Sequence, residues 1–105
     1  MADFVLLYSG GSMPETEEEQ AQVMKAWDGW FHEIGAALKD GGNPFTPAAR
    51  TVAADGAVSD AKGPLLSGYT IVKADSLDEA TTIAKGSPVL HGGASITIYE
   101  TFEVM

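Results

Sequence analysis

The chain has 105 residues, a formal net charge of −9 and no cysteine. This length suits one compact domain, so we expect residues 1–105 to form a single domain. The negative charge disfavours nucleic acid and anionic membrane surfaces as partners, because both carry negative charge themselves. The lack of cysteine excludes disulfides, thiolate metal sites and cysteine nucleophiles, and it fits a reducing compartment.

The first residues, Met1-Ala2-Asp3, contain no basic segment, so we expect no secretory signal. No apolar run approaches the roughly 18 residues that a membrane-spanning helix needs. We therefore expect a cytoplasmic protein.

The first predicted element is a strand, "DFVLLYS", which Gly10-Gly11 ends. Alternation places Phe4, Leu6 and Tyr8 on one face of this strand. Val5 and Leu7 lie on the other face. Since both faces are apolar, we predict a strand that is buried on both sides.

A long helix is predicted over residues 12–42, where Gly41-Gly42 supplies a left-handed stop. Ser12 with Glu15, or Thr16 with Glu19, has the spacing of a capping box. Large apolar residues recur every three or four positions and form one face of this helix. They are Val23, Trp27, Trp30, Phe31, Ile34 and Leu38.

Two short strands around Asp55-Gly56 follow a loop, and this dipeptide is common in hairpin turns. A strand over residues 69–74 leads to a helix that Ser76 caps, with Glu79 three positions later. Gly86 and Pro88 end that helix. A last strand, "SITIYETFEV", places Ile96, Ile98, Phe102 and Val104 on one face and Tyr99 on the other.

With the short hairpin counted as one β element, the predicted order β-α-β-β-α-β is typical of an α+β, ferredoxin-like unit, with an antiparallel sheet and two helices on one face. The other face would then expose Val5 and Leu7, together with Thr70 and Val72 or their alternates. Monomers seldom leave so continuous an apolar patch in water. We therefore predict a homodimer in which two sheets pack on each other, as a dimeric α+β barrel.

The loop Asp40-Gly41-Gly42-Asn43-Pro44 combines a carboxylate, an amide and flexible backbone. Asn43 has the groups to hydrogen-bond a ligand carbonyl, which would make this loop the wall of a pocket. The alternative is a helix stop followed by a turn.

Aromatic residues supply a second candidate wall. Trp27, Trp30, Phe31 and Tyr69 would line an apolar pocket between helix and sheet, although such a stripe is more often core.

Histidines are few. Asp28 and His32 are i, i+4 neighbours on the predicted helix. This spacing suits an acid–base pair, and the alternative is an ordinary exposed pair of helix residues. His91 precedes two glycines that would let a ligand approach the backbone, and it is otherwise an ordinary loop histidine. Without an HExxH motif or a cysteine pair, the sequence predicts no metal site and no cofactor.

Several segments resemble the YCII-related proteins, a family also called DGPF-domain proteins. These are "WDGWFHEIGAALKDGGNPF", the "DGAVSD" hairpin, "LSGYTIVKADSLDEATTIAKGSP" and "HGGASITIYET". The resemblance implies a dimeric α+β barrel of the ferredoxin-like kind. It also implies a hydrolase or dehalogenase-like role that uses a His and an Asp for some relatives, and a link to sigma factors for others. Asp60 is the residue that the resemblance carries over.

Two functions follow. In the first, each subunit binds a small, largely apolar organic molecule between helices and sheet. Asp40, Asn43, Asp60 or His91 supplies the polar contacts. Asp60 and His91 are the candidate catalytic residues, with Asp60 as the general base. In the second, the protein is a non-catalytic regulatory dimer whose acidic surface binds a basic protein of the transcription machinery.

Overall fold

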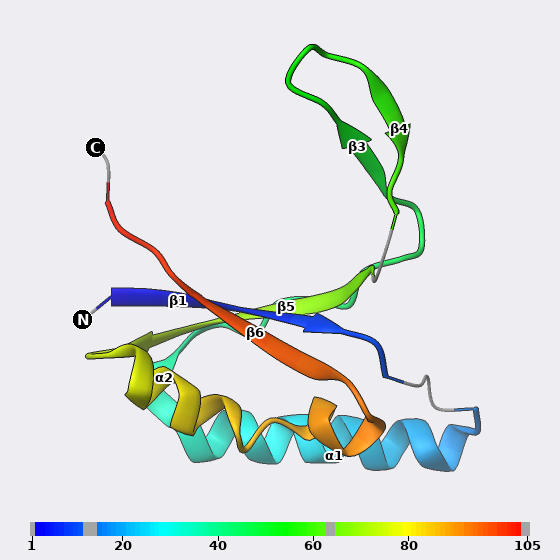
Figure 1. The fold of residues 1–105 in the computed structure, drawn as a ribbon. Helices are drawn as coiled ribbons and strands as arrows, with labels where there is room; N and C mark the ends of the chain where they lie inside the picture. Colours follow the sequence, from blue (N-terminus) through cyan, green and yellow to red (C-terminus); the bar gives the residue numbers. More distant parts are fainter. Residues whose placement is uncertain (1, 12–14, 63–64, 104–105) are drawn as a thin grey trace.

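The computed structural model describes residues 2–11, 15–62 and 65–103. Its main sheet is antiparallel with strand order β2-β5-β1-β6, and both α-helices lie on one face of it (Figure 1). The strands are Ala2–Ser9 (β1), Leu38–Asp40 (β2), Leu66–Ala74 (β5) and Ser95–Glu100 (β6). The helices are Glu17–Ile34 (α1) and Leu77–Ala84 (α2), with short 3-10 turns at Gly35–Ala37 (η1) and Pro88–Gly92 (η2). This is the predicted ferredoxin-like α+β fold.

The predicted hairpin forms, but as a separate two-stranded sheet. It pairs Arg50–Val52 (β3) with Val58–Asp60 (β4), and we call residues 50–60 the arm. Gly56 has a φ of 89°, and the Ala57 N–H donates to Asp55 Oδ1 at 2.9 Å, so the Asp-Gly turn behaves as predicted. The arm stands off the main sheet on the side opposite the helices (Figure 1).

The second strand of the main sheet is β2, in a segment that we predicted as helix. The helix ends at Ile34, because Gly35 takes a φ of 52° and its N–H closes on the Phe31 carbonyl. Placing the end of the helix at Gly41-Gly42 was therefore wrong. Leu38 leaves the helical stripe and instead lies opposite Val72 in the sheet.

Side-chain caps fix the starts of both helices. Thr16 Oγ1 accepts a hydrogen bond from the Glu19 N–H at 3.0 Å, which confirms the second of the two predicted caps. Ser76 Oγ accepts from the Glu79 N–H at 3.1 Å, as predicted. The alternative cap at Ser12 lies outside the described residues.

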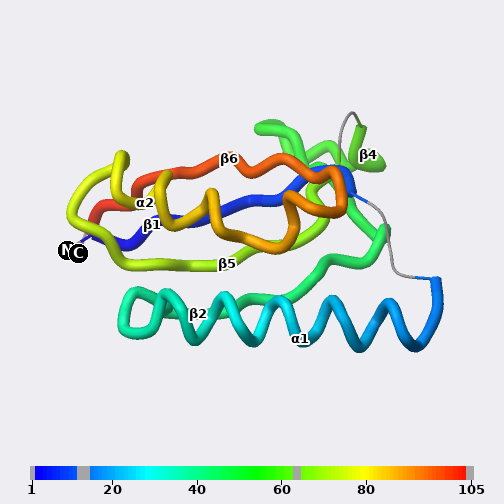
Figure 2. Tube along the Cα trace, turned by 90° about the horizontal axis from the view of Figure 1, so that it is seen from below, coloured from blue at the N-terminus to red at the C-terminus, as the bar shows by residue number. Residues whose placement is uncertain are grey.

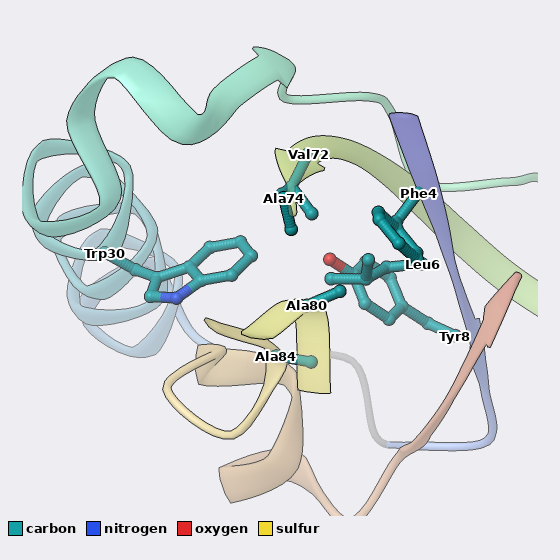
Figure 3. Close-up of a cluster of buried hydrophobic side chains, with 8 residues drawn as sticks. All are labelled: Phe4, Leu6, Tyr8, Trp30, Val72, Ala74, Ala80 and Ala84. Atoms are coloured by element: carbon teal, nitrogen blue, oxygen red, sulfur yellow. The ribbon is translucent and has the colours of Figure 1, made fainter. Parts of the chain in front are cut away.

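The core fills the space between the sheet and the two helices. Small residues of α2 allow it to approach β1, β5 and β6 closely, while α1 runs along the β2 side of the sheet (Figure 2). The indole Nε1 of Trp30 donates to the Ile83 carbonyl at 3.3 Å and so ties α1 to α2. The core side chains shown in Figure 3 are Phe4, Leu6, Tyr8, Trp30, Val72, Ala74, Ala80 and Ala84.

We call the opposite surface of the main sheet the open face, and no helix of the described residues lies on it (Figure 1). Val5 and Leu7 lie there, half-buried, so within one subunit β1 is fully buried only on its helix side. Burial of its other face stays a prediction that depends on the homodimer. On β5, Ile71 lies opposite Val5 and Tyr69 lies opposite Leu7, while Thr70 and Val72 belong to the core. In the part of the chain that the structure describes, no helix combines the length and apolarity needed to cross a membrane.

Candidate functional site

A hollow of about 530 Å³ lies at the base of the arm and contains Asp60. Asp60 lies opposite Arg50 in the β3–β4 register, and Arg50 Nε is 3.3 Å from Asp60 Oδ1. The hollow mixes these two charges with small apolar side chains. Its lining residues are Pro47, Ala48, Ala49, Arg50, Asp60, Ala61 and Leu65.

The Arg50–Asp60 pair is open to solvent, since the two side chains are 72% and 90% exposed. An exposed ion pair contributes little to stability, so neither charge is needed to hold the fold. Both groups remain available to a ligand: the guanidinium donates to carboxylates or phenolates, and the carboxylate accepts protons. Sequence reasoning missed Arg50. Positions 50 and 60 are equidistant from Asp55, and that symmetry was the signal for their pairing.

The loop after β2 is ordered by its own contacts. Asp40 Oδ1 accepts a hydrogen bond from the Gly42 N–H at 2.8 Å, and Asn43 is exposed. The ring of Phe45 stacks on Tyr69, with centroids 5.7 Å apart. One carboxylate oxygen of Asp40 is therefore engaged in the turn. Tyr69 presents an aromatic surface at the edge of the open face.

Trp27 and Phe31 lie on the other side of the sheet from Tyr69. The Trp27 ring contacts Tyr8, Trp30 and Phe31, with centroids 5.6–5.8 Å apart. Phe31 also lines a shallow hollow of about 440 Å³ on α1, together with Met24, Lys25 and Asp28. The predicted aromatic wall is thus divided between the core and the open face.

The structure does not bring the two candidate catalytic residues together. His91 is exposed in η2, which lies with the helices, whereas Asp60 lies in β4 on the opposite side of the main sheet (Figure 1). Asp28 and His32 are both exposed on α1. Among residues 2–11, 15–62 and 65–103, no three His, Asp or Glu side chains are grouped so as to hold a metal ion.

One buried polar chain went unnoticed in the sequence. The Tyr8 hydroxyl donates to Thr70 Oγ1 at 2.5 Å, and Thr70 donates to the Gly41 carbonyl at 3.2 Å. Burial raises the pKa of Tyr8 above its ordinary value of 10.0, and hydrogen bonds to Thr70 and Ser87 partly oppose that rise. The available signal was an inward-facing tyrosine, because a buried phenol needs a partner.

Comparison with solved structures places this fold beside a known enzyme. The chain is similar to 5-chloro-2-hydroxyhydroquinone dehydrochlorinase (TftG) from Burkholderia phenoliruptrix AC1100, solved in complex with 2,5-dihydroxybenzoquinone. The TM-score is 0.50 at 14% identity, and the match covers 94% of this chain and 93% of the other. No curated protein matches the sequence. The model of the YCII-related domain matches residues 8–104, and the chain therefore belongs to the YCII-related family.

Proposed function

We propose that this protein is an enzyme-like homodimer that binds a small, partly aromatic organic molecule in the hollow at the base of the arm. Asp60 is the general base there, and Arg50 holds an acidic group of the ligand. The observation that carries the proposal is the Arg50–Asp60 pair, which lines a hollow large enough for a small molecule. The similarity to an enzyme that acts on a hydroxylated ring supports the choice of ligand.

A homodimer is supported by the apolar centre of the open face. Val5, Leu7 and Ile71 lie side by side there, and Tyr99 is 57% exposed next to them. Burying a large apolar side chain stabilises an association by about 1.5–3 kcal/mol, and less where the side chain is already half-buried. A second sheet placed over this patch would remove it from water.

The distribution of charge favours the same arrangement. Most acidic residues lie on the helices or beside them, on the side that a face-to-face dimer turns outward. They are Glu15, Glu17, Glu18, Glu19, Asp28, Glu33, Asp75, Asp78 and Glu79. Lys39 and Lys73 instead lie on β2 and β5, where Lys39 forms an ion pair with Asp3. Two open faces can therefore meet without strong repulsion, although the chain as a whole is acidic.

A test of the site uses 5-chloro-2-hydroxyhydroquinone as the probe and chloride release as the readout. Asp60→Asn should lower turnover by about 100-fold or more, because a positioned general base contributes roughly that much. Binding of 2,5-dihydroxybenzoquinone, measured by calorimetry, should change little in this variant but weaken in Arg50→Gln.

The matched control is Asp55→Asn, at the turn of the same hairpin and outside the residues that line the hollow. It should leave both readouts unchanged. If wild-type protein neither binds nor turns over these probes, the ligand class is wrong. If Asp60→Asn keeps full turnover, Asp60 is not the base.

The regulatory alternative rests on a different observation, the separation of Asp60 from His91 across the sheet. A non-catalytic dimer would use the acidic helix layer to bind a basic protein surface. Affinity capture with purified dimer, washed at 50 mM and 300 mM salt, would recover such a partner only at the lower salt. Recovery of a bound small molecule with no protein partner would favour the enzyme-like function.

A further inference from the structure

The arm is an amphipathic hairpin whose apolar side chains are exposed. Its register places Val52 opposite Val58 and Arg50 opposite Asp60, so these four side chains share one face. Thr51 and Ser59 form the other face. All residues of β3 and β4 are exposed, and Val52 and Val58 are 66% and 60% exposed.

A two-stranded hairpin is marginally stable in water without further packing. The substantial contacts of β3 and β4 in the described chain are with each other. The arm also extends the molecule: the radius of gyration is 15.2 Å, against about 13 Å for a compact chain of this length. Since no other element of the described residues packs substantially on the arm, its paired apolar face is open to a cover from a second molecule.

A second copy of this chain fits that cover best. The arm projects on the side of the open face, where the proposed dimer places its partner (Figure 1). Two packed sheets lie about 10 Å apart, so a projection on that side must run against the partner subunit. Arg50 and Asp60 form a mixed pair within this surface, so the arm meets the partner without excess charge of either sign.

We propose that the arm of each subunit packs its Val52 and Val58 face against the partner subunit. The partner then closes the hollow of that arm, which Arg50 and Asp60 line. Arg50 and Asp60, which line the hollow, share a face of the hairpin with the two valines, so a partner that lies along this face reaches both. Each ligand site would then be complete only in the dimer. This inference rests on the proposed homodimer and adds the surface that completes its site.

The experiment uses single cysteines, since the natural chain has none. Val58→Cys places a thiol on the apolar face, and Ser59→Cys places one on the opposite face of the same strand. Reaction with a maleimide is measured above and below the protein concentration at which sedimentation shows dissociation. The thiol at position 58 should react at least 10-fold more slowly in the dimer than in the monomer, while the thiol at position 59 reacts equally fast in both.

The outcomes separate the two proposals. A stable dimer in which position 58 reacts as fast as position 59 overturns the role of the arm and leaves the sheet-to-sheet dimer standing. A chain that stays monomeric at every concentration overturns both. Circular dichroism of each variant confirms that the fold is retained before labelling.

Discussion

At the scale of single residues, the buried phenol of Tyr8 places the most specific demand on the fold, because its hydroxyl needs a hydrogen-bond partner inside the core. Its hydroxyl donates a hydrogen bond to Thr70, which in turn donates to the Gly41 carbonyl. A buried hydroxyl that loses its partner costs more than the bond contributes, so β1 and β5 must stay in register for this chain to form. The polar chain therefore makes the core specific as well as apolar.

Tyr8→Phe tests this chain. We expect a loss of about 1 kcal/mol of unfolding free energy at pH 8, the usual contribution of one hydrogen bond. Burial holds the pKa of Tyr8 above 10.0, so its stabilising effect is complete below pH 10 and is lost as the pH rises through the folded-state pKa. Urea unfolding at pH 8 and pH 11 should show a smaller decline for Tyr8→Phe than for wild type.

The control for that measurement is Tyr99→Phe, because Tyr99 is exposed on β6 and belongs to no buried chain. Its stability should follow the wild type at both pH values. A decline in Tyr8→Phe as steep as in wild type would show that Tyr8 does not set the alkaline limit.

At the scale of elements, the connection from β2 to the arm is placed by a close approach to β5. Gly42 has a φ of 73°, and a Cβ built there would lie 1.7 Å from the Tyr69 carbonyl oxygen. The backbone of residues 41–45 can follow β5 this closely only because position 42 lacks a side chain. The Phe45–Tyr69 stack and the start of the arm both depend on that path.

Gly42→Ala should therefore destabilise the fold by more than 3 kcal/mol, because a backbone clash adds to the roughly 1–2 kcal/mol cost of left-handed geometry. Gly10→Ala is the matched control. Gly10 has nearly the same φ, 77°, but no atom of the residues that the structure describes lies within 4 Å of the added Cβ. Thermal unfolding of the two variants separates the cost of the clash with Tyr69 from the cost of left-handed backbone geometry. Equal losses of stability in both variants would contradict the close approach of Gly42 to β5.

Helices and turns were predictable where residues close together in the sequence mark their boundaries. Ser76 with Glu79, and Asp55 with Gly56, are short-range signals that the structure confirms. The end of α1 was missed because Gly35 lies within an apolar stripe that continues in helical spacing to Leu38. Pairing of Leu38 with Val72 outweighs that local pattern. Family resemblance proposed Asp60 as a site residue, whereas Arg50 was not proposed because its position depends on pairing across the arm.

At the scale of the whole molecule, two surfaces of opposite character divide the chain. The helix layer holds most of the acidic groups, and the open face holds an apolar centre with lysines at its edge. Sequence alternation predicted this apolar face and left open which residues of β5 contribute to it. A net charge of −9 alone would argue against self-association, and the segregation of acidic groups away from the open face removes that objection to the proposed homodimer.

Leu7→Lys tests the open face directly. Leu7 is half-buried beside Tyr69 and Thr97, so a lysine can extend its amine to solvent in the monomer without unfolding it. In the proposed dimer the same amine is trapped between two sheets, together with its symmetry mate, and loses its hydration. We expect the dimer dissociation constant, measured by sedimentation, to rise at least 100-fold. Gln22→Lys adds the same charge at an exposed position of α1 and should leave dissociation within about 3-fold of wild type. Equal affinities of the two variants would mean that the open face is not the surface through which the subunits meet.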